Sequence, residues 1–593
     1  MYQSIKDSPS LKHESQSIYL PENFATKVEE VLEDWQKNQK VQRLWNKDAS
    51  LWTNTDEAEW LGWLEITQKQ LANLDRLQKF AQEVKELECC YSLLMGMGGS
   101  SLCPEVLSMT FNRAPGHPEL HILDSTDPDQ IQSIADTIEP TLTLFTVSSK
   151  SGTTLETNLF KQYFFEIAQQ AMGSEFAGNH FIAITDQNSP LERIAKRDRF
   201  RRIFFGVPSI GGRYSALSDF GMVPAAVIGI DLAKFLHQTQ AMVETCANFI
   251  PQDNPGVVLG AVLGVLANEG RDKVTFIISP SISGLGAWLE QLLAESTGKQ
   301  GKGIIPVDLE PFGTPEVYGS VKAERLLVRD RLFVYIRLES APDPAQDRDV
   351  EALKQAGHLI VRIQVADPYH LGQEFFRWQM ATAVAGSIIG INPFDQPDVE
   401  ASKVVTKQLI AEYEKTGSVP SEKPIFEEGN IRLFADEKNA TALEEAVGAS
   451  KSLVNYLRAH LNRLHPGDYF ALLAFIERNE PHQAQLQLIR QAVRDFKRVA
   501  TCLGFGPRYL HSTGQAYKGG PNTGVFLQIT CDDAIDLPIP GQKYTFGVVK
   551  AAQARADFQV LAQRNRRALR VHLGANVTAD LAVLGAAIQE ALR

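Results

Sequence analysis

The sequence has few cysteines and no long hydrophobic segment. Its 593 residues include six cysteines, with no Cys-x-x-Cys pair and no clustering of cysteine with histidine. Neither a disulfide framework nor a zinc site is therefore expected. No run reaches the length of a membrane-spanning helix, and the N-terminal MYQSIKDSPSLKHESQ lacks the apolar core of a signal peptide. We expect a reduced, cytoplasmic, soluble protein.

An excess of positive charge is also missing. Lys and Arg number 59 against 71 Asp and Glu, so the formal net charge is −12. This balance does not favour binding to nucleic acid or to anionic membranes, and no helix-turn-helix pattern or basic patch is present. The hydrophobic fraction of 44% and charged fraction of 22% are typical of globular proteins and exclude disorder, collagen and coiled coils. The length predicts roughly three or four domains.

Short apolar segments alternate with helical patterns along most of the chain. Buried parallel strands covered by helices have this composition, so the fold class is predicted to be α/β with parallel sheets. Predicted strands cover residues 91–95, 120–123, 142–147, 181–185 and 202–206, then 274–278, 332–338 and 359–365, and finally 469–475 and 525–529. In the last block a helix is predicted over 483–499.

Breaks in these patterns predict the domain boundaries. Residues 1–88 form an N-terminal tail and a helical layer, whose four tryptophans we interpret as core packing. A first α/β domain covers 89–250 and a second covers 251–414, with a proline-containing break at 251–255 between them. A break at 415–430 with glycine and prolines precedes a third α/β unit at 425–593.

Two loops rich in glycine and hydroxyl groups follow neighbouring predicted strands. MGMGGSSLCPEV, residues 95–106, contains Gly96, Gly98, Gly99 and Ser100. Its glycines allow a tight turn and close approach to an anion at a helix start, although a plain strand-to-helix turn fits equally well. Its spacing matches neither a dinucleotide fingerprint nor a P-loop.

The second loop, VSSKSGTTLETN at residues 147–158, has more hydroxyl groups than one helix cap requires. It contains Ser148, Lys150 and Gly152 together with Ser149, Ser151, Thr153 and Thr154. A capped turn is the alternative interpretation. Because ligands of α/β proteins bind where neighbouring strands end, we favour a cradle for phosphate oxygens.

Three further segments contain candidate catalytic groups. In IGGRYSALSDFG, Gly211 and Gly212 place Arg213 at a bend, where a guanidinium can bind phosphate or stabilise an enediolate. In WLEQLLAESTGKQGKG, Gln291 and Glu295 are four residues apart and so share one helix face. Glu295 near a helix end is a candidate general base. For both segments a solvated salt-bridge residue is the alternative.

The last segment, INPFDQPDVEASK, contains Gln396 and Lys403 two helical turns apart. A lysine at this place could donate a proton or hold a sugar oxygen. A solvated surface lysine is the alternative interpretation.

In this order the five segments resemble the phosphoglucose isomerase family, which interconverts glucose 6-phosphate and fructose 6-phosphate. GGSS, SSKSGTT, GGRYS, QLLAESTGK and FDQPDVEASK are each similar to family signatures, and together they span about residues 90–405. The resemblance implies two sugar-isomerase (SIS) domains, each a parallel sheet flanked by helices, with the substrate between them. The third C-terminal α/β unit is most similar to the isomerase portion of bacterial transaldolase–phosphoglucose isomerase fusions.

The resemblance also implies a role for each residue. Glu295 would move the proton between C1 and C2 with Gln291 beside it, and Arg213, presented by Gly212, would stabilise the enediolate. Gln396 and Lys403 would bind the sugar end, and Lys403 could help to open the ring. No metal or redox cofactor is needed for this chemistry. The phosphate and nearby sugar hydroxyls would be bound by Ser100, Ser149, Lys150, Ser151, Thr153 and Thr154.

One departure from the family concerns its ring-opening histidine, which is expected a few tens of residues after the catalytic glutamate. Residues 296–357 contain no histidine. The segment RYLHSTGQAYKGGPNTG, residues 508–524, resembles the histidine segment of some bacterial relatives. Residues 544–558 also look like a variant of residues 371–386. We therefore expect the third unit to be a degenerate partial repeat that supplies His511, within the chain or across a dimer.

Other activities are weighed against this interpretation. A transaldolase barrel needs several hundred residues upstream, and only about 90 precede the first motif, so no transaldolase activity is expected. A dual glucose/mannose phosphate isomerase and a non-catalytic sugar-phosphate sensor remain as alternatives, and Glu295 argues against the sensor. An amidotransferase is disfavoured because no cysteine occupies the N-terminus. The expected partner is a small sugar phosphate, and the family relationship allows a homodimer.

Overall fold

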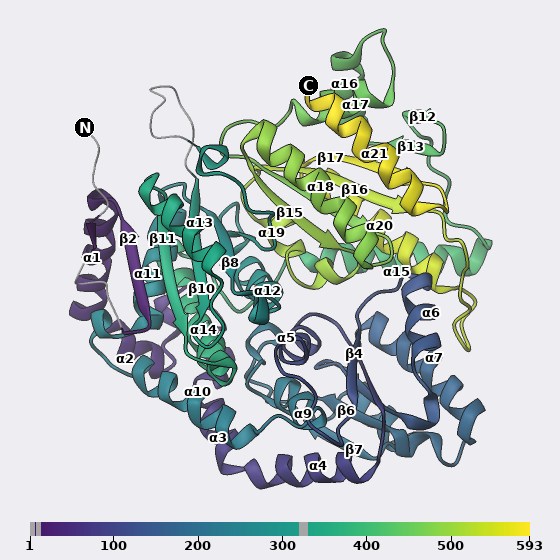
Figure 1. The fold of residues 1–593 in the computed structure, drawn as a ribbon. Helices are drawn as coiled ribbons and strands as arrows, with labels where there is room; N and C mark the ends of the chain where they lie inside the picture. The colour runs from purple at the N-terminus through teal and green to yellow at the C-terminus, as the bar shows by residue number, and fades with distance from the viewer. Residues whose placement is uncertain (1–5, 8–13, 320–329) are drawn as a thin grey trace. The chain divides into compact units, whose positions relative to one another are not determined.

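The computed structural model describes residues 6–7, 14–319 and 330–593 (Figure 1). Contacts between residues divide the chain into two compact units. Unit 1 comprises Met1–Asp124, Ile134–Thr297 and Leu332–Asp395, and unit 2 comprises Ser125–Ser133, Gly298–Arg331 and Gln396–Arg593. Two short segments from the first part of the chain therefore pack with its C-terminal part.

The first sheet of unit 1 is parallel throughout, with the strand order β4-β3-β5-β6-β7. All five strands confirm the predicted segments to within one residue. They are β3 (Tyr91–Gly96), β4 (Glu119–Leu123), β5 (Thr143–Ser148), β6 (Phe181–Thr185) and β7 (Arg202–Phe205). Gly96 of β3 pairs with Ser148 of β5, so the two glycine- and hydroxyl-rich loops leave the sheet side by side at its carboxyl edge.

The second sheet of unit 1 differs from the expected all-parallel arrangement. Its strands in this unit lie in the order β1-β2-β11-β10-β8. The β10–β11 pair is parallel, but β2 is antiparallel to both β11 and β1. Their bounds are β1 (Lys6–Asp7), β2 (Gln16–Leu20), β8 (Lys273–Ile278), β10 (Arg331–Leu338) and β11 (Leu359–Val365).

Strand β2 corrects the prediction that the first 40 residues form only a tail and a helix. Gln16, Ile18 and Leu20 are buried, whereas Ser17 and Tyr19, which alternate with them, are half-buried. This alternation is that of a strand with one face on the core. The segment contains only two aliphatic residues, which is why it reads as polar in the sequence.

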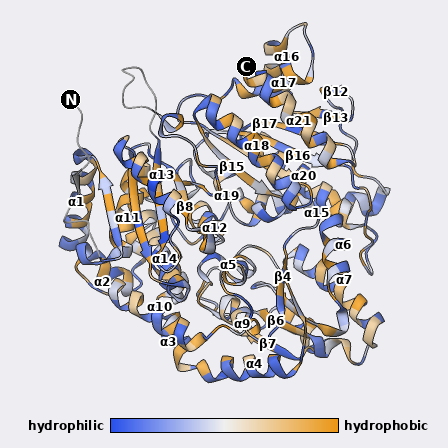
Figure 2. Ribbon diagram, viewed as in Figure 1, coloured by the Kyte–Doolittle hydropathy of each residue, from blue (hydrophilic) through white to orange (hydrophobic). Residues whose placement is uncertain are grey.

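Helices cover the two sheets of unit 1. Figure 2 shows hydrophobic residues along much of β10 and β11 and long hydrophilic stretches on α4. The helices are α1 (Glu22–Lys37), α2 (Lys40–Trp45), α3 (Ile66–Ala72), α4 (Leu74–Glu86), α5 (Leu102–Thr110), α7 (Leu155–Met172), α8 (Pro190–Arg197), α9 (Asp219–Val227), α10 (Leu232–Cys246), α11 (Pro255–Asn268), α12 (Leu285–Thr297), α13 (Pro344–Gln355) and α14 (Leu371–Ile389).

Unit 2 is built on a third sheet with the order β12-β13-β17-β16-β14-β15. The last four strands are parallel, and β12 and β13 form an antiparallel edge. The predicted strands at 469–475 and 525–529 are confirmed, but β15 and β17 were not predicted. The bounds are β12 (Phe426–Glu428), β13 (Ile431–Phe434), β14 (Tyr469–Phe475), β15 (Ala500–Phe505), β16 (Gly524–Cys531) and β17 (Arg567–Leu573), while β9 (Ile305–Val307) also belongs to this unit.

The main core of unit 2 lies between this sheet and helices α17, α18 and α21, of which α18 and α21 run side by side (Figure 1). The unit's helices are α15 (Val399–Thr416), α16 (Glu437–Val447), α17 (Leu453–Leu461), α18 (Glu480–Lys497), α19 (Gly514–Gly519), α20 (Phe546–Gln563) and α21 (Val577–Leu592). Helix α6 (Pro128–Thr137) begins in this unit and ends in unit 1. Among the described helices, none has the length and hydrophobicity required to cross a membrane.

The third sheet repeats the topology of the second. In each sheet an antiparallel pair of strands, β1-β2 or β12-β13, lies at one edge. The three long strands follow in reverse chain order, as β11, β10 and β8 in the second sheet and as β17, β16 and β14 in the third. Along the chain, β8-α12-β9-β10-α13-β11-α14 corresponds to β14-α18-β15-β16-α20-β17-α21.

This correspondence corrects the similarity drawn between residues 544–558 and 371–386. The first stretch contributes α20, which lies between two strands, whereas the second forms α14, which follows the last strand. The topological counterpart of α20 is α13.

Candidate active site

In unit 1, the loop after β3 packs closely against the backbone of Gly212 and Arg213. A Cβ atom placed on Gly99 would lie 2.0 Å from the carbonyl oxygen of Gly212, so only glycine allows this packing. Ser215 Oγ donates to the carbonyl of Gly212 at 2.6 Å. Ser100, predicted to bind the substrate, is buried at the end of this first loop. The backbone ahead of Arg213 is thereby fixed against the first predicted anion loop.

Hydroxyl groups of the second loop bond to one another rather than to the helix that follows. Ser149 Oγ and Thr154 Oγ1 are 2.9 Å apart, as are Ser151 Oγ and Thr153 Oγ1. The amide of Gly152 donates to Ser149 Oγ at 3.1 Å. Thr154 is the N-cap of α7 but makes no side-chain cap hydrogen bond. The side chain of Thr154 therefore does not cap α7, whereas Ser149 and Ser151 accept from amides within the loop.

Lys150 bonds to residues outside this hydroxyl cluster. Its ammonium forms an ion pair with Asp186 and lies 3.4 Å from the carbonyl oxygens of Val207 and Pro208. The amide of Asp186 in turn donates to the carbonyl of Lys150 at 3.0 Å. These bonds hold the loop against the residues that follow β6 and β7.

Arg213 lies at the centre of a buried hydrogen-bond network. Its side chain is 1% exposed and belongs to the 3-10 helix Gly212–Tyr214. Nε donates to Ser296 Oγ at 2.7 Å, and Nη2 donates to the carbonyls of Pro393 and Asp395 at 2.8 and 2.9 Å. The guanidinium is therefore held in one orientation by neutral acceptors.

The same guanidinium faces the predicted base. Arg213 Nη1 lies 3.4 Å from Glu295 Oε1, and the Glu295 side chain retains 14% exposure. Gln291 Nε2 donates to Glu295 Oε2 at 2.9 Å, which confirms that the two side chains share one face of α12. Unit 1 thus brings a carboxylate, a carboxamide and a fixed positive charge together.

Three predicted site residues belong to unit 2. Gln396 is exposed just before α15. Lys403, on α15, has a 48% exposed side chain that pairs with Glu400 at 2.6 Å. His511 is half-buried at the end of the 3-10 helix Arg508–His511, directly before α19. The roles of these three residues stay predictions.

Sequence reasoning missed Ser296, whose hydroxyl orients Arg213. Its position next to Glu295 was the only signal available. The carbonyls of Pro393 and Asp395 were missed as well, although they lie in the same motif as Gln396. Backbone acceptors carry no signature in a side-chain motif, so only the structure could reveal them.

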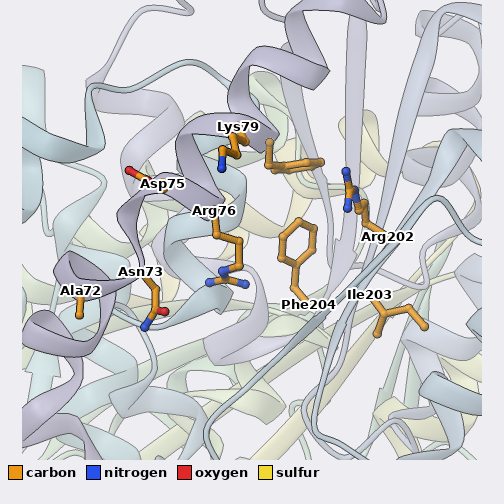
Figure 3. A pocket seen from close by; sticks show the side chains of 9 residues that line it. Ala72, Asn73, Asp75, Arg76, Lys79, Arg202, Ile203 and Phe204 are labelled. Carbon is orange, nitrogen blue, oxygen red and sulfur yellow. The ribbon is translucent and has the colours of Figure 1, made fainter.

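A separate cavity of about 530 Å³ lies between α4 and β7 (Figure 3). Arg76 stacks over the ring of Phe204, 5.6 Å from its centroid, and its guanidinium binds Asp219 at 2.6 and 2.8 Å. Arg202 pairs with Glu83. The cavity shares no residue with the predicted site, and carboxylates already neutralise two of its three cations.

One group of potential metal ligands occurs among the described residues. Ligand atoms of Asp127, Cys531 and Asp533 lie within 4.8 Å of one another. The ammonium of Lys550 bonds to all three, at 2.8 Å for Asp127 and 3.6 Å for Cys531. Burial alone would lower the pKa of Lys550. The negative charges of Asp127 and its neighbours together have a larger effect in the opposite direction, so the pKa lies above the ordinary value. A protonated lysine supplies the cation here, and these residues do not fit a metal.

The first comparisons with known proteins concern sequence. The family model for phosphoglucose isomerase matches residues 75–307. A glucose-6-phosphate isomerase from Rubrobacter xylanophilus is 30% identical over 351 residues, which cover 53% of this chain and 80% of the relative. The chain belongs to the phosphoglucose isomerase family. A glucose-6-phosphate isomerase from Carboxydothermus hydrogenoformans is 26% identical over 59% of this chain and 85% of its own length.

Solved structures with a similar fold are known. A hypothetical protein from Thermus thermophilus superposes with a TM-score of 0.56 at 25% identity, covering 66% of this chain and 99% of that one. A glucose-6-phosphate isomerase from Chlamydia trachomatis has the same fold, with a TM-score of 0.51 at 21% identity over 60% of this chain and 75% of its own. The family match contains the motifs around Ser100, Ser149, Arg213 and Glu295, whereas Lys403 and His511 lie outside it.

Proposed function

We propose that this protein catalyses the reversible isomerisation of glucose 6-phosphate and fructose 6-phosphate, a step of glycolysis and gluconeogenesis. Membership of the phosphoglucose isomerase family supports this activity. The observation that carries the proposal is the arrangement of Glu295 on α12, where its carboxylate accepts from Gln291 and faces the Arg213 guanidinium. A general base is required for isomerisation but not for binding alone.

The reaction needs a base that removes a proton and returns it to the neighbouring carbon. Glu295 takes the proton from C2 of the open-chain aldose, and the electron pair moves to the C1 carbonyl to give a cis-enediolate. The hydroxyl proton of O2 passes to O1, and Glu295 then delivers its proton to C1, which leaves the ketone at C2 and a hydroxyl at C1. Arg213 stabilises the negative oxygen, because its orientation is fixed before the charge develops.

The phosphate binds at the loop between β5 and α7. Ser151 and Thr153 are exposed, and Ser149 and Thr154 lie behind them. Together with the start of an 18-residue helix, these hydroxyls suit a dianion. Ser100 and Gly212 contribute from the adjoining loops. Lys150 supports this loop through Asp186.

His511 opens the sugar ring, with Gln396 and Lys403 holding the sugar end. The repeated topology supports this assignment. The family histidine is expected a few tens of residues after the catalytic glutamate, and this stretch of the chain begins just after β9. His511 follows β15, the counterpart of β9 in the third sheet. The histidine therefore occupies the corresponding position one repeat later.

The remaining parts of the proposal concern the cellular setting. We place the enzyme in the cytoplasm, where sugar phosphates of glycolysis are found, with a small sugar phosphate as its partner. A homodimer is proposed from the family relationship. The domain boundaries at residues 89–250, 251–414 and 425–593 each enclose the central strands of one sheet and are retained on that basis.

The test is a coupled assay with fructose 6-phosphate that follows the appearance of glucose 6-phosphate. We expect Glu295→Gln to lower kcat by at least about a hundredfold, because the amide cannot accept the proton. Glu290→Gln changes a carboxylate on the same helix and serves as the matched control. Saturable binding of the sugar phosphate without turnover by the wild type would refute the isomerase and favour a sensor. Mannose 6-phosphate is assayed in parallel to test for dual specificity.

A further inference from the structure

Gln515 is a buried residue of unit 2 that connects three segments of the chain. It is the second residue of α19 and is fully buried. Its Nε2 donates to the carbonyl of Gly298 at 3.0 Å and to Asp398 Oδ2 at 2.7 Å. Its Oε1 accepts from the amide of Asp398 at 2.9 Å. Both donors and the oxygen of one carboxamide are therefore used to hold two distant loops.

Each segment that Gln515 connects is a close neighbour of a predicted catalytic residue along the chain. Gly298 follows Glu295 by three residues. Asp398 is the N-cap residue of α15, which carries Lys403, and it follows Gln396 by two residues. His511 precedes Gln515 itself by four residues.

The contacts around Gln515 reinforce the same junction. The amide of Gly301 donates to the carbonyl of Gly519 at 2.9 Å. A Cβ atom on Gly519 would lie 2.1 Å from Asp398 Oδ2 and 2.8 Å from the carbonyl of Gly298. Arg564 pairs with Asp398 Oδ1 at 2.7 Å. The loop after Glu295 and the start of α15 are thus packed directly on α19.

Helix α19 is itself anchored on its other side. Lys518 Nζ bonds to Asp557 Oδ1 at 2.6 Å, and both side chains are about 1% exposed. The hydroxyl of Tyr509, two residues before His511, donates to the same carboxylate. Burial, together with the charge of Asp557, raises the pKa of Tyr509, so this hydroxyl stays protonated. A short helix of six residues needs such anchors, because it has little stability of its own.

We infer that Gln515 is a positioning residue for the isomerase reaction. It fixes the chain next to Glu295, Lys403 and His511 through one carboxamide, without touching the substrate. Displacing catalytic groups by about 1 Å can cost a hundredfold in rate. The role of the third unit is then to keep these three segments in register. This inference rests on the proposed function.

Gln515→Leu tests the inference, because it keeps the side-chain volume and removes all three hydrogen bonds. We expect kcat to fall at least about tenfold, with a smaller change in KM for fructose 6-phosphate. In D2O, a larger fraction of the product should carry deuterium, because a loosely held base exchanges its proton with solvent. A merely structural role would leave this fraction unchanged.

The matched control is Gln553→Leu. Gln553 is also a buried glutamine of unit 2, and its Oε1 accepts from Thr126 Oγ1 at 2.7 Å. Its kcat should stay within about twofold of the wild type, even if its thermal midpoint falls as far as that of Gln515→Leu. Equal kcat values for the two variants would overturn the inference.

A second variant keeps the test decisive if Gln515→Leu does not fold. Gln515→Asn keeps a carboxamide but shortens it by one methylene, so it cannot reach both Gly298 and Asp398. An intermediate loss of kcat is expected, and wild-type kcat with wild-type deuterium incorporation would refute the role. An inactive wild type would instead refute the proposed function, and this role with it.

Discussion

Arg213 and Glu295 face each other at 3.4 Å with little exposed surface between them. Because Ser296 and two backbone carbonyls already hold the guanidinium, its position does not depend on the charge of Glu295. Neutralising the carboxylate by proton uptake therefore leaves the cation in place. A base that must take up and release a proton benefits from a partner that does not move.

The pairing of Gln291 with Glu295 could be predicted from the sequence, but the setting of Arg213 could not. Four residues along one helix fix the first geometry locally. The carbonyls that orient Arg213 lie about 180 residues away in the sequence, and no local pattern encodes them. Lys150 illustrates the same limit, since its partner Asp186 follows a different strand.

His460 provides a prediction about pH at the level of a single residue. Burial, reinforced by the charges of Arg463 and Arg567, lowers its pKa to about 3. Its Nε2 lies 3.0 Å from the carbonyl of Phe526. The folded protein keeps this imidazole neutral, whereas the unfolded chain binds a proton near pH 6.5. The stabilising contribution is therefore present above pH 6.5 and is lost as the pH falls toward 3.

We expect lowering the pH from 7 to 5 to cost about 2 kcal/mol of unfolding free energy through His460. The measurement is urea unfolding of wild type and His460→Gln at both pH values. The glutamine amide can still donate to the carbonyl of Phe526 but does not titrate. Between pH 7 and pH 5, His460→Gln should therefore lose about 2 kcal/mol less unfolding free energy than the wild type. The same pH dependence in both proteins would contradict the prediction.

At the scale of elements, strands were predictable where they form short, largely apolar runs. Strands β3, β5 and β6 are buried almost throughout, whereas the edge strands β4 and β7 are mostly half-buried or exposed, and the ends of all five lie within one residue of the prediction. Strand β17 was missed because Arg567 and Arg570 suggest a surface segment. In the structure Arg567 pairs with Asp468, and Arg570 binds Glu422 and stacks on Phe434. Tertiary partners thus make charged residues acceptable in a strand.

The loop between β5 and α7 leads to a second prediction. Ser151 is exposed, and its hydroxyl bonds only within the loop, to Thr153. If it binds the phosphate, Ser151→Ala should raise KM for fructose 6-phosphate about tenfold, the value of one hydrogen bond to a charged group. Stability should change little, because an exposed side chain is removed.

Steady-state kinetics and thermal unfolding of Ser151→Ala check both parts of this prediction. Ser108→Ala is the control, since Ser108 on α5 also bonds locally, to the carbonyl of Glu105. Inorganic phosphate should inhibit the Ser151 variant more weakly than the wild type. An unchanged KM together with unchanged phosphate inhibition would exclude Ser151 from the phosphate site.

For the whole molecule, the alternation of strands and helices predicts the α/β class and the three sheets, but not the way contacts divide the chain. Residues 125–133 join unit 2 because Asp127 binds Lys550 and Thr126 donates to Gln553. The segment around Glu310 joins it because the Glu310 carboxylate accepts from the Thr501 hydroxyl at 2.7 Å. These are buried polar contacts between segments hundreds of residues apart, which no composition shift announces.

The hydrogen bond between Gln515 and Gly298 leads to a prediction about which chain supplies each predicted catalytic group. Gln515 bonds to Gly298 of the same chain, and these residues lie four and three residues from His511 and Glu295. We expect Glu295 and His511 of one chain to serve the same active site, even if the protein is a homodimer.

Complementation between inactive chains tests this expectation. Glu295→Gln and His511→Ala are each expected to lower kcat about a hundredfold or more. The two variants are co-expressed with different tags, and the mixed species is purified through both. If each chain uses its own residues, both sites of a mixed dimer lack one group and no activity returns. Sharing across a two-fold interface would instead restore one site in two, about half of wild-type activity, and would show that the third unit acts on the partner.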